Sequence, residues 1–489
     1  MPVNSVHPAH RAPYYLLMRA CCEGEAAVKA LGSTDVLNGP VLPKPSGIAA
    51  MELDPETAAN AELMWAAYRA RATFSELIGP TIDGLIGLAF RVPWEIELPE
   101  RMEQYRESIT PDGKSMQELA EYMTREVLQT ARLGLYSDMG ENQNPVLLTY
   151  TAESIINWRG QMLPTRVVLE ESEEVEKPED PFVVEERKVW RVLELVDGQF
   201  VVAEYRKRAD GEVGDEFVRE EMPTQTFSGD GIPFTIAGSQ NRDLEPDKFI
   251  PLWPMAKHLL KAYQVSADYY QSLYLTAQAT AIFTGVNKPQ DENDTDTIDE
   301  TPHTLGAGTV WSFAQSDAKA FYMEFSGPGI QAQKEELDTQ HTLAMQYSHY
   351  LTEKGSSVES GEALGQRVKA RTASLKSTII NCAYALEQAL KNAAIWKQID
   401  PEGVKVTPNL EFSDAEIEAT LVTAFTNAVQ SDAMTDTMFW QWLRDKGITE
   451  LEDDEIRTIL DDQAERKREA EESRAVLPTA NPLGDDLAA

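Results

Sequence analysis

The sequence predicts an α+β protein that is mainly helical and carries a β-rich segment in its N-terminal half. Residues 329–400 contain no proline and include two segments with the spacing of amphipathic helices, 330–352 and 362–398. From 146 to 234 the apolar residues follow instead the two-residue period of strands. A chain of 489 residues can bury an ample core, and it usually divides into about two to four domains.

The N-terminal part is predicted to be helical before the strands begin. Helices are expected around 14–31 and 56–77, and a glycine-rich apolar stretch follows them. Ser115 and Glu118 match a capping box, so a third helix should open there and run to about Leu133. The β-rich part should then contain strands at 165–169, 189–195, 200–205 and 216–220, with turns at Asp197-Gly198 and Asp210-Gly211.

The C-terminal half is predicted to be helical with one polar insert. A helix is expected at 256–283, and the polar insert follows at 286–328. The two long helices then flank a short polar loop, 353–361. Capping residues, glycines and prolines place the remaining elements: a strand at 403–412, helices at 413–429, 436–446 and 453–472, and a disordered tail at 476–489.

The longer of the two long helices carries an apolar stripe. Its apolar residues alternate at spacings of four and seven, an eleven-residue period that keeps the stripe on one face of a nearly straight helix. At ~1.5 Å per residue the helix would be about 55 Å long. It fits either the core of a large α-rich domain or the spine, hinge or wall of an assembly. The stripe consists of Leu364, Val368, Leu375, Ile379, Leu386 and Leu390.

The net charge of −37 is the strongest signal in the composition. Proteins that grip nucleic acid tightly display basic surfaces, because counterion release drives that binding. The charge therefore argues against a repressor, polymerase or nuclease. It is compatible with a conduit through which DNA slides without sticking, and equally with acidity that merely keeps a large protein soluble.

The chain shows no feature of a membrane or disulfide-bonded protein. No apolar run approaches the ~20 residues needed to span a bilayer, and the N-terminus lacks the pattern of a signal peptide. Three cysteines, with Cys21 and Cys22 adjacent, do not make a disulfide framework. Reduced thiols in a cytoplasm are the simplest interpretation, and no membrane partner is expected.

No motif points to catalysis, a cofactor or a metal. The acidic run starting at Asp291 resembles a calcium loop but has Asp296 and Pro302 where that loop needs glycine and glutamate. His341 and His349 lie two helical turns apart, too far for a shared metal. Cys382 falls within the long helix, where packing explains it better than nucleophilic chemistry.

The long helix is basic in an otherwise acidic chain. Arg367, Lys369 and Arg371 cluster just after the polar loop, on the flank of the apolar stripe. They could pair with acidic residues of a neighbouring subunit, contact a nucleic-acid backbone, or form an ordinary solvated face.

Taken in order along the chain, these segments resemble tailed-bacteriophage portal proteins, in particular a group long catalogued as a family of unknown function. The resemblance covers about residues 7–470. In the N-terminal part it rests on His7-Pro8, 24–29, Tyr68-Arg69, Arg71-Ala72, 81–91 and 150–159. In the C-terminal half it rests on Ile250-Pro251-Leu252, Ala262-Tyr263, Ser266, Ser360-Gly361-Glu362-Ala363-Leu364 and Phe412-Ser413.

The resemblance implies a portal-like fold with a β-rich wing, long stem and wing helices and a helical crown. A clip without a clear strand signature departs from the pattern. The implied parts are a wing at 1–255 with its β-rich part at 146–234, a first stem helix at 256–283, a clip at 284–328, a second stem helix at 330–352, a tunnel loop at 353–361, a long wing helix and strand at 362–412, a crown at 413–475 and a tail at 476–489.

The resemblance also implies a homo-oligomeric ring of about twelve subunits at one capsid vertex of a virion, assembled in the host cytoplasm. Double-stranded DNA would pass through it without sequence preference, and the terminase large subunit, a head–tail adaptor and the major capsid and scaffolding proteins would bind it. In such a ring the charge pattern of the long helix leads us to expect Arg367, Lys369 and Arg371 at the subunit interface. The DNA channel would be lined by Lys354, Gly355, Ser356, Ser357, Val358, Glu359 and Ser360.

Two other functions stay open from the sequence alone. One is an enzyme, such as a hydrolase with an unrecognised site, which turnover would reveal. The other is a scaffold protein that works as a monomer or dimer, which a mass measurement would separate from a ring.

Overall fold

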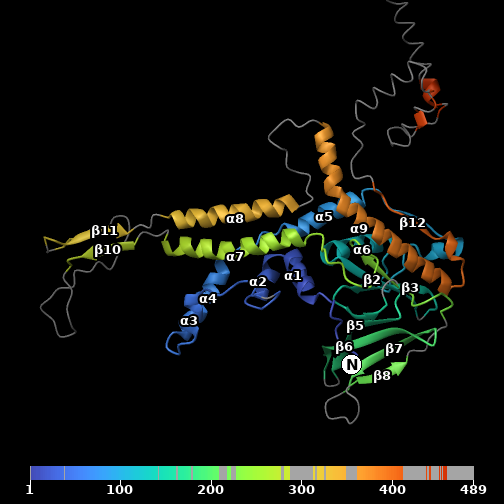
Figure 1. The fold of residues 1–489 in the computed structure, drawn as a ribbon, viewed down its shortest axis with the longest axis horizontal. Coiled ribbons are helices and arrows are strands. Elements are labelled where there is room, and N and C mark those ends of the chain that lie inside the picture. Colours follow the sequence, from blue (N-terminus) through green and yellow to red (C-terminus); the bar gives the residue numbers. More distant parts are fainter. Residues whose placement is uncertain are drawn as a thin grey trace, which may run out of the picture. The chain divides into compact units, whose positions relative to one another are not determined.

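The computed structural model describes most of the N-terminal 410 residues. The described residues are 2–37, 39–140, 142–160, 163–177, 180–208, 217–221, 227–276, 280–286, 312–313, 316–323, 327–347, 361–410 and a few positions between 435 and 459. The backbone alone is described for 177, 180–181, 221, 280–281, 322–323 and 361–374. The chain forms two compact units, Met1–Leu410 and Glu411–Ala489. The elements below all belong to the first unit, and it is α+β, as predicted (Figure 1).

Short helices build the N-terminal part. The predicted helix at 14–31 is in fact two, because Gly24 takes a φ of +105° that ends one helix and starts the next. The predicted helix at 56–77 stops at Arg71. The glycine-rich stretch is itself a helix with one buried apolar face, which includes Ile78, Ile82 and Leu85. The helices are α1 (Ala12–Glu23), α2 (Glu25–Leu31), α3 (Ser46–Glu52), α4 (Ala58–Arg71), α5 (Ile78–Ala89), the 3₁₀ helix η1 (Glu100–Tyr105) and α6 (Met116–Thr130).

The capping box that opens α6 is present. The Ser115 hydroxyl accepts a hydrogen bond from the Glu118 N–H at 3.2 Å, and the Glu118 carboxylate accepts one from the Ser115 N–H at 2.8 Å. The helix ends at Thr130 rather than near Leu133, because Ala131 takes the left-handed conformation (φ 64°) and the next strand starts at Arg132.

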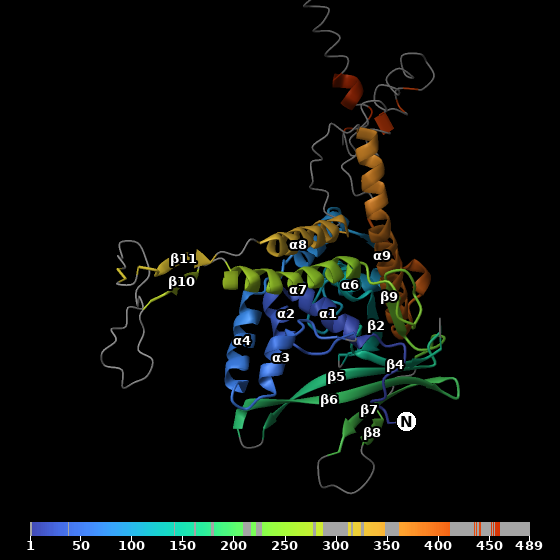
Figure 2. The same ribbon diagram turned by 60° about the vertical axis from the view of Figure 1, so that its left-hand side comes forward.

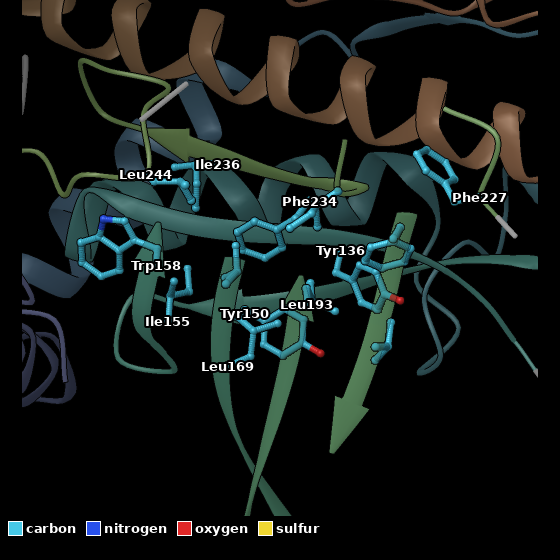
Figure 3. Packing of buried hydrophobic residues seen from close by; sticks show 14 residues of the cluster. Tyr136, Tyr150, Ile155, Trp158, Leu169, Leu193, Phe227, Phe234, Ile236 and Leu244 are labelled. Carbon is cyan, nitrogen blue, oxygen red and sulfur yellow. The ribbon is translucent and has the colours of Figure 1, made fainter. Parts of the chain in front are cut away.

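The strands between Arg132 and Gly238 form two antiparallel sheets that share a core (Figure 3). The order is β3-β2-β9 in the three-stranded sheet and β4-β5-β6-β7-β8 in the five-stranded sheet. The aromatic rings of Tyr136, Tyr150 and Phe234 meet the second sheet's Leu169 and Leu193 in this core. The strands are β2 (Arg132–Met139), β3 (Pro145–Thr151), β4 (Ile155–Arg159), β5 (Arg166–Lys177), β6 (Asp180–Val196), β7 (Gln199–Lys207), β8 (Phe217–Glu221) and β9 (Phe234–Gly238).

The four predicted strands of this region correspond to β5, β6, β7 and β8, and the turn at Asp197-Gly198 is present. β5 and β6 are longer than predicted, because glutamates extend both strands beyond their apolar alternation. The predicted turn at Asp210-Gly211 lies outside the described residues.

A helical pair and a small hairpin follow the sheets. The predicted helix at 256–283 is wrong at its C-terminal end, where Thr280–Thr284 forms a strand rich in β-branched and aromatic residues. That strand pairs antiparallel with a second one inside the predicted polar insert. The elements are α7 (Trp253–Thr276), β10 (Thr280–Thr284), β11 (Lys319–Met323) and α8 (Pro328–Tyr347).

The last long helix, α9 (Gly361–Trp396), runs back onto the three-stranded sheet (Figure 2). The short helix η2 (Pro401–Gly403) and strand β12 (Lys405–Thr407) follow it. β12 is shorter than the predicted strand at 403–412 and pairs antiparallel with β1 (Glu95–Glu97). Among the described residues no helix combines the length and apolarity that a bilayer span requires.

Candidate functional site

Helices α7 and α8 lie side by side and carry the hairpin β10–β11 at their far end (Figures 1 and 2). The Nδ1 atom of His258 on α7 lies 2.8 Å from Oε1 of Gln340 on α8. The imidazole of His258 also stacks on Tyr347, with ring centroids 5.7 Å apart and planes at 11°. These polar and aromatic contacts fix how the two helices are aligned along their length.

Burial in this helical pair is confined to the N-terminal part of α7 and to two positions of α8. The buried residues of α7 all lie between Met255 and Ala267, within its first fifteen positions. Beyond them Tyr274 and Leu275 are 59% and 61% exposed. In α8 the described residues include only two buried ones, Leu337 and Ala344. Tyr274 and Leu275 thus give the C-terminal end of α7 an exposed apolar surface, which has the character of an interaction surface.

Helix α4 supports the C-terminal part of α7. The Tyr68 hydroxyl donates a hydrogen bond to the Asp268 carboxylate at 2.6 Å, and Arg71 donates one to Oε1 of Gln271 at 2.9 Å. The Arg71 guanidinium lies 3.7 Å from the ring centroid of Tyr274. Burial, followed by the hydrogen bond to Asp268, raises the pKa of Tyr68, so this phenol stays protonated as a donor.

The C-terminal part of α9 is a core helix. Leu375, Ile379, Leu386 and Leu390, four members of the predicted stripe, are fully or almost fully buried. Ser137 of β2 donates its hydroxyl to the Ala389 carbonyl at 2.8 Å, and the Trp396 indole donates to the Ser137 carbonyl at the same distance. The sheet therefore holds this half of the helix in place.

The predicted interface residues lie in the N-terminal half of α9. The backbone at Arg367, Lys369 and Arg371 is helical, and their side chains lie outside the described part of the chain. The predicted channel residues Lys354, Gly355, Ser356, Ser357, Val358, Glu359 and Ser360 also lie outside it. Both assignments remain predictions.

A partly buried ion-pair network attaches the first helix, α1, to its neighbours. The Arg19 guanidinium donates to Glu126 at 2.6 and 2.9 Å and to Glu153 at 2.9 Å. Burial would raise the pKa of Glu153, but the hydrogen bonds and charge of Arg19 outweigh that effect, so the pKa lies below its ordinary value. The network joins α1 to α6 and to the turn before β4.

The described residues contain no group of three or more His, Cys, Asp or Glu side chains that could hold a metal ion. Cys382 is buried within α9, and burial raises the pKa of its thiol to about 12, so it is a packing residue with no thiolate character near neutral pH.

The family described as Domain of unknown function (DUF4055) matches residues 251–397. The matched segment contains α7, the hairpin β10–β11, α8 and α9, the elements that make up this site. No curated protein matches the chain.

Three solved chains are similar to this one at 13% sequence identity. One belongs to the neck of an empty GTA particle computed with C6 symmetry, with a TM-score of 0.40 over 74% of this chain and 87% of that one. Another belongs to the virion of a native gene transfer agent (GTA) particle, with a TM-score of 0.38 over 85% and 95%. A third belongs to the neck of a native GTA particle computed with C12 symmetry, with a TM-score of 0.36 over 84% and 95%. These values are below the level at which a shared fold or function can be inferred.

Sequence patterns did not single out the side chains that align this site. His258, Gln340, Tyr68 and Asp268 are polar residues on helices, where a solvated face is the ordinary expectation. Tyr68 lies in a segment that carries the portal resemblance, which was the available signal. Their pairing depends on which helices become neighbours.

Proposed function

We propose that this chain is a portal subunit: its copies form a closed ring, of about twelve, at one vertex of a tailed-phage-like particle. The ring would be the conduit through which double-stranded DNA enters the capsid and leaves it. The terminase motor would dock on it during packaging, and a head–tail adaptor afterwards. The energy for packaging would come from that partner, and the portal itself would hydrolyse neither ATP nor DNA.

The observation that carries this proposal is the helical pair α7–α8. It leaves the core with an exposed apolar end, bears a small hairpin, and leads back through α9 into the sheets. This is the order of stem, clip, stem and long wing helix that the portal resemblance implies. Exposed apolar helices of this kind need partners, and in a ring the neighbouring copies supply them.

Electron microscopy of the purified protein tests the ring. We expect closed rings with a central channel wide enough for duplex DNA. Monomers or dimers alone, over a range of protein and salt concentrations, would contradict the proposal and favour the scaffold alternative. Nucleotide or DNA turnover that a point mutation in this chain abolishes would favour the hydrolase alternative.

The channel loop and the basic helix face have a joint test. Deleting residues 355–360 should leave rings intact and reduce packaging or retention of DNA, since a small polar loop with Gly355 can move against passing DNA. Reversing the charge at Arg367 and Arg371 should weaken assembly itself, if they bridge to acidic groups of the next subunit. Normal packaging by the loop-deleted ring would show that the loop is only a connector.

A further inference from the structure

A groove with a basic rim runs along the N-terminal half of α7. Its volume is about 440 Å³, and its apolar wall includes Leu17 of α1, Val41, and Trp253 and Leu260 of α7. Lys257 and Lys261 line it one helical turn apart, and both are exposed. Within the described residues neither lysine forms an ion pair, although the chain has 81 acidic residues against 44 basic ones.

The outer half of the β5–β6 hairpin has the complementary character. Phe182, Val183 and Val184 are 94%, 41% and 49% exposed. Exposed carboxylates surround them, from Glu173, Glu174 and Glu176 on β5 and from Glu185 and Glu186 on β6. The end of the hairpin thus combines apolar side chains with negative charge.

This outer half also has no sheet to support it. β6 pairs with β7 only from Val189 onward, whereas its residues before Val189 pair with β5 alone. Figure 2 shows the two strands continuing as a long ribbon beyond the shorter β7 and β8. An isolated two-stranded ribbon is marginally stable in water, so the part of β6 before Val189, which pairs with β5 alone, indicates a binding partner.

We propose that the outer β5–β6 hairpin of one copy docks in the α7 groove of the next copy. The inference rests on the ring proposed above and names one contact that would hold it together. Phe182, Val184 and Glu186 share one face of the ribbon, and so does Glu174, the cross-strand partner of Glu186. Phe182 and Val184 would lie against the apolar wall, and the carboxylates of Glu174 and Glu186 would face the ammonium groups of Lys257 and Lys261. Groove and hairpin are different surfaces of the same chain, so the contact is head-to-tail, the kind that closes a ring.

The chemistry of the groove favours a peptide over nucleic acid. Duplex DNA is bound through many phosphate contacts along an open basic surface. Here two lysines border a wall made of leucine, valine and tryptophan side chains, which suits a short segment with apolar residues between carboxylates.

Charge reversal tests the contact. The double variants K257E/K261E and E174K/E186K should each raise the protein concentration needed for half-maximal ring assembly at least tenfold in mass photometry. The four-fold variant that combines them should return toward wild type, because the charges face each other again. K207E/K248E changes the net charge equally at exposed lysines elsewhere and should assemble like wild type.

A crosslink supplies a readout that does not depend on assembly strength. In V184C/L260C protein, mild oxidation should give a ladder of covalent multimers, and neither single variant should give one. The native Cys21 and Cys382 are buried and should not contribute, whereas Cys22 is partly exposed, so every variant in this experiment also carries Cys22→Ser.

The outcomes separate this contact from the proposed ring. If wild-type protein forms no rings, the proposed function fails and this contact fails with it. If wild-type rings form and both double variants assemble normally, only the docking is overturned. Weak assembly that the combined variant does not restore would mean that groove and hairpin bind other surfaces. Loss of DNA retention with normal assembly in K257E/K261E would assign the groove to DNA.

Discussion

Arg19 is the residue on which the attachment of the first helix depends. Its guanidinium reaches two carboxylates that belong to different elements, and the Glu126 side chain is only 8% exposed. Removing the cation would leave that carboxylate in a poorly hydrated position with no charged partner.

Replacing Arg19 with methionine should therefore lower the free energy of unfolding by about 3 kcal/mol at pH 7, as for one partner of a buried pair. The effect should be measured as a shift in urea unfolding. Arg125→Met is the matched control, because Arg125 pairs with Asp83, which is 66% exposed, and such pairs contribute less than about 1 kcal/mol. Equal losses in the two variants would contradict a special role for Arg19.

The ion pair between Arg19 and Glu153 also predicts how the stability of the protein changes with pH. The pKa of Glu153 lies below its ordinary value of 4.5 in the folded protein. Its carboxylate therefore stabilises the native state above pH 4.5, and this contribution is lost as the pH falls through the lower, folded-state pKa. The stability difference between wild type and Arg19→Met should shrink below pH 4.5 in the same urea experiment. A difference that stays constant down to pH 3 would exclude the electrostatic explanation.

At the scale of single elements, strand β2 depends on a glycine. A Cβ atom at Gly134 would lie 2.5 Å from the ring of Phe234 and 3.0 Å from Ile155, both in the core shared by the two sheets. The small residue lets β9 and β4 approach the strand, so its role is close packing.

Gly134→Ala should destabilise the protein by about 1 to 3 kcal/mol through overpacking. Gly87→Ala in α5 is the control, because nothing lies within 4 Å of a Cβ there. In that helix alanine should be neutral or stabilising by up to about 1 kcal/mol. The urea midpoint should fall for Gly134→Ala and stay or rise for Gly87→Ala, and a loss of stability from both would argue against the packing explanation.

Elements with strong local signals could be predicted from sequence, and the others depended on tertiary context. The apolar stripe of α9 and the capping box of α6 are local sequence patterns that depend on helix geometry alone, so both helices were predicted. β10 was predicted as helix, because a five-residue apolar run such as Thr280–Thr284 fits either period. α5 was missed, because its glycines hid a regular apolar face. The pairing of His258 with Gln340 follows from packing that no local pattern encodes.

At the scale of the whole molecule, the net charge of −37 should keep free DNA away. A labelled 30-base-pair duplex should show no saturable binding in fluorescence anisotropy at about 150 mM salt, with an affinity weaker than the ~10⁻⁴ M at the weak end of non-specific binders. Micromolar affinity under these conditions would contradict a conduit in which DNA slides without sticking. A basic DNA-binding protein in the same assay is the positive control.

The contacts between β2 and α9 also determine when the core can be completed during synthesis. Ser137 of β2 bonds to Ala389 of α9, and β1 pairs with β12. In both cases the N-terminal partner is synthesised long before the C-terminal one. At about 5 to 20 residues per second, the ribosome needs on the order of 10 to 50 s to make the intervening chain, and during that time an apolar sheet face stays uncovered. A nascent chain in this state is a natural client for chaperones. A chain that stops after Tyr347 should therefore aggregate on expression, whereas the full chain should complete its core on release and remain in the soluble fraction.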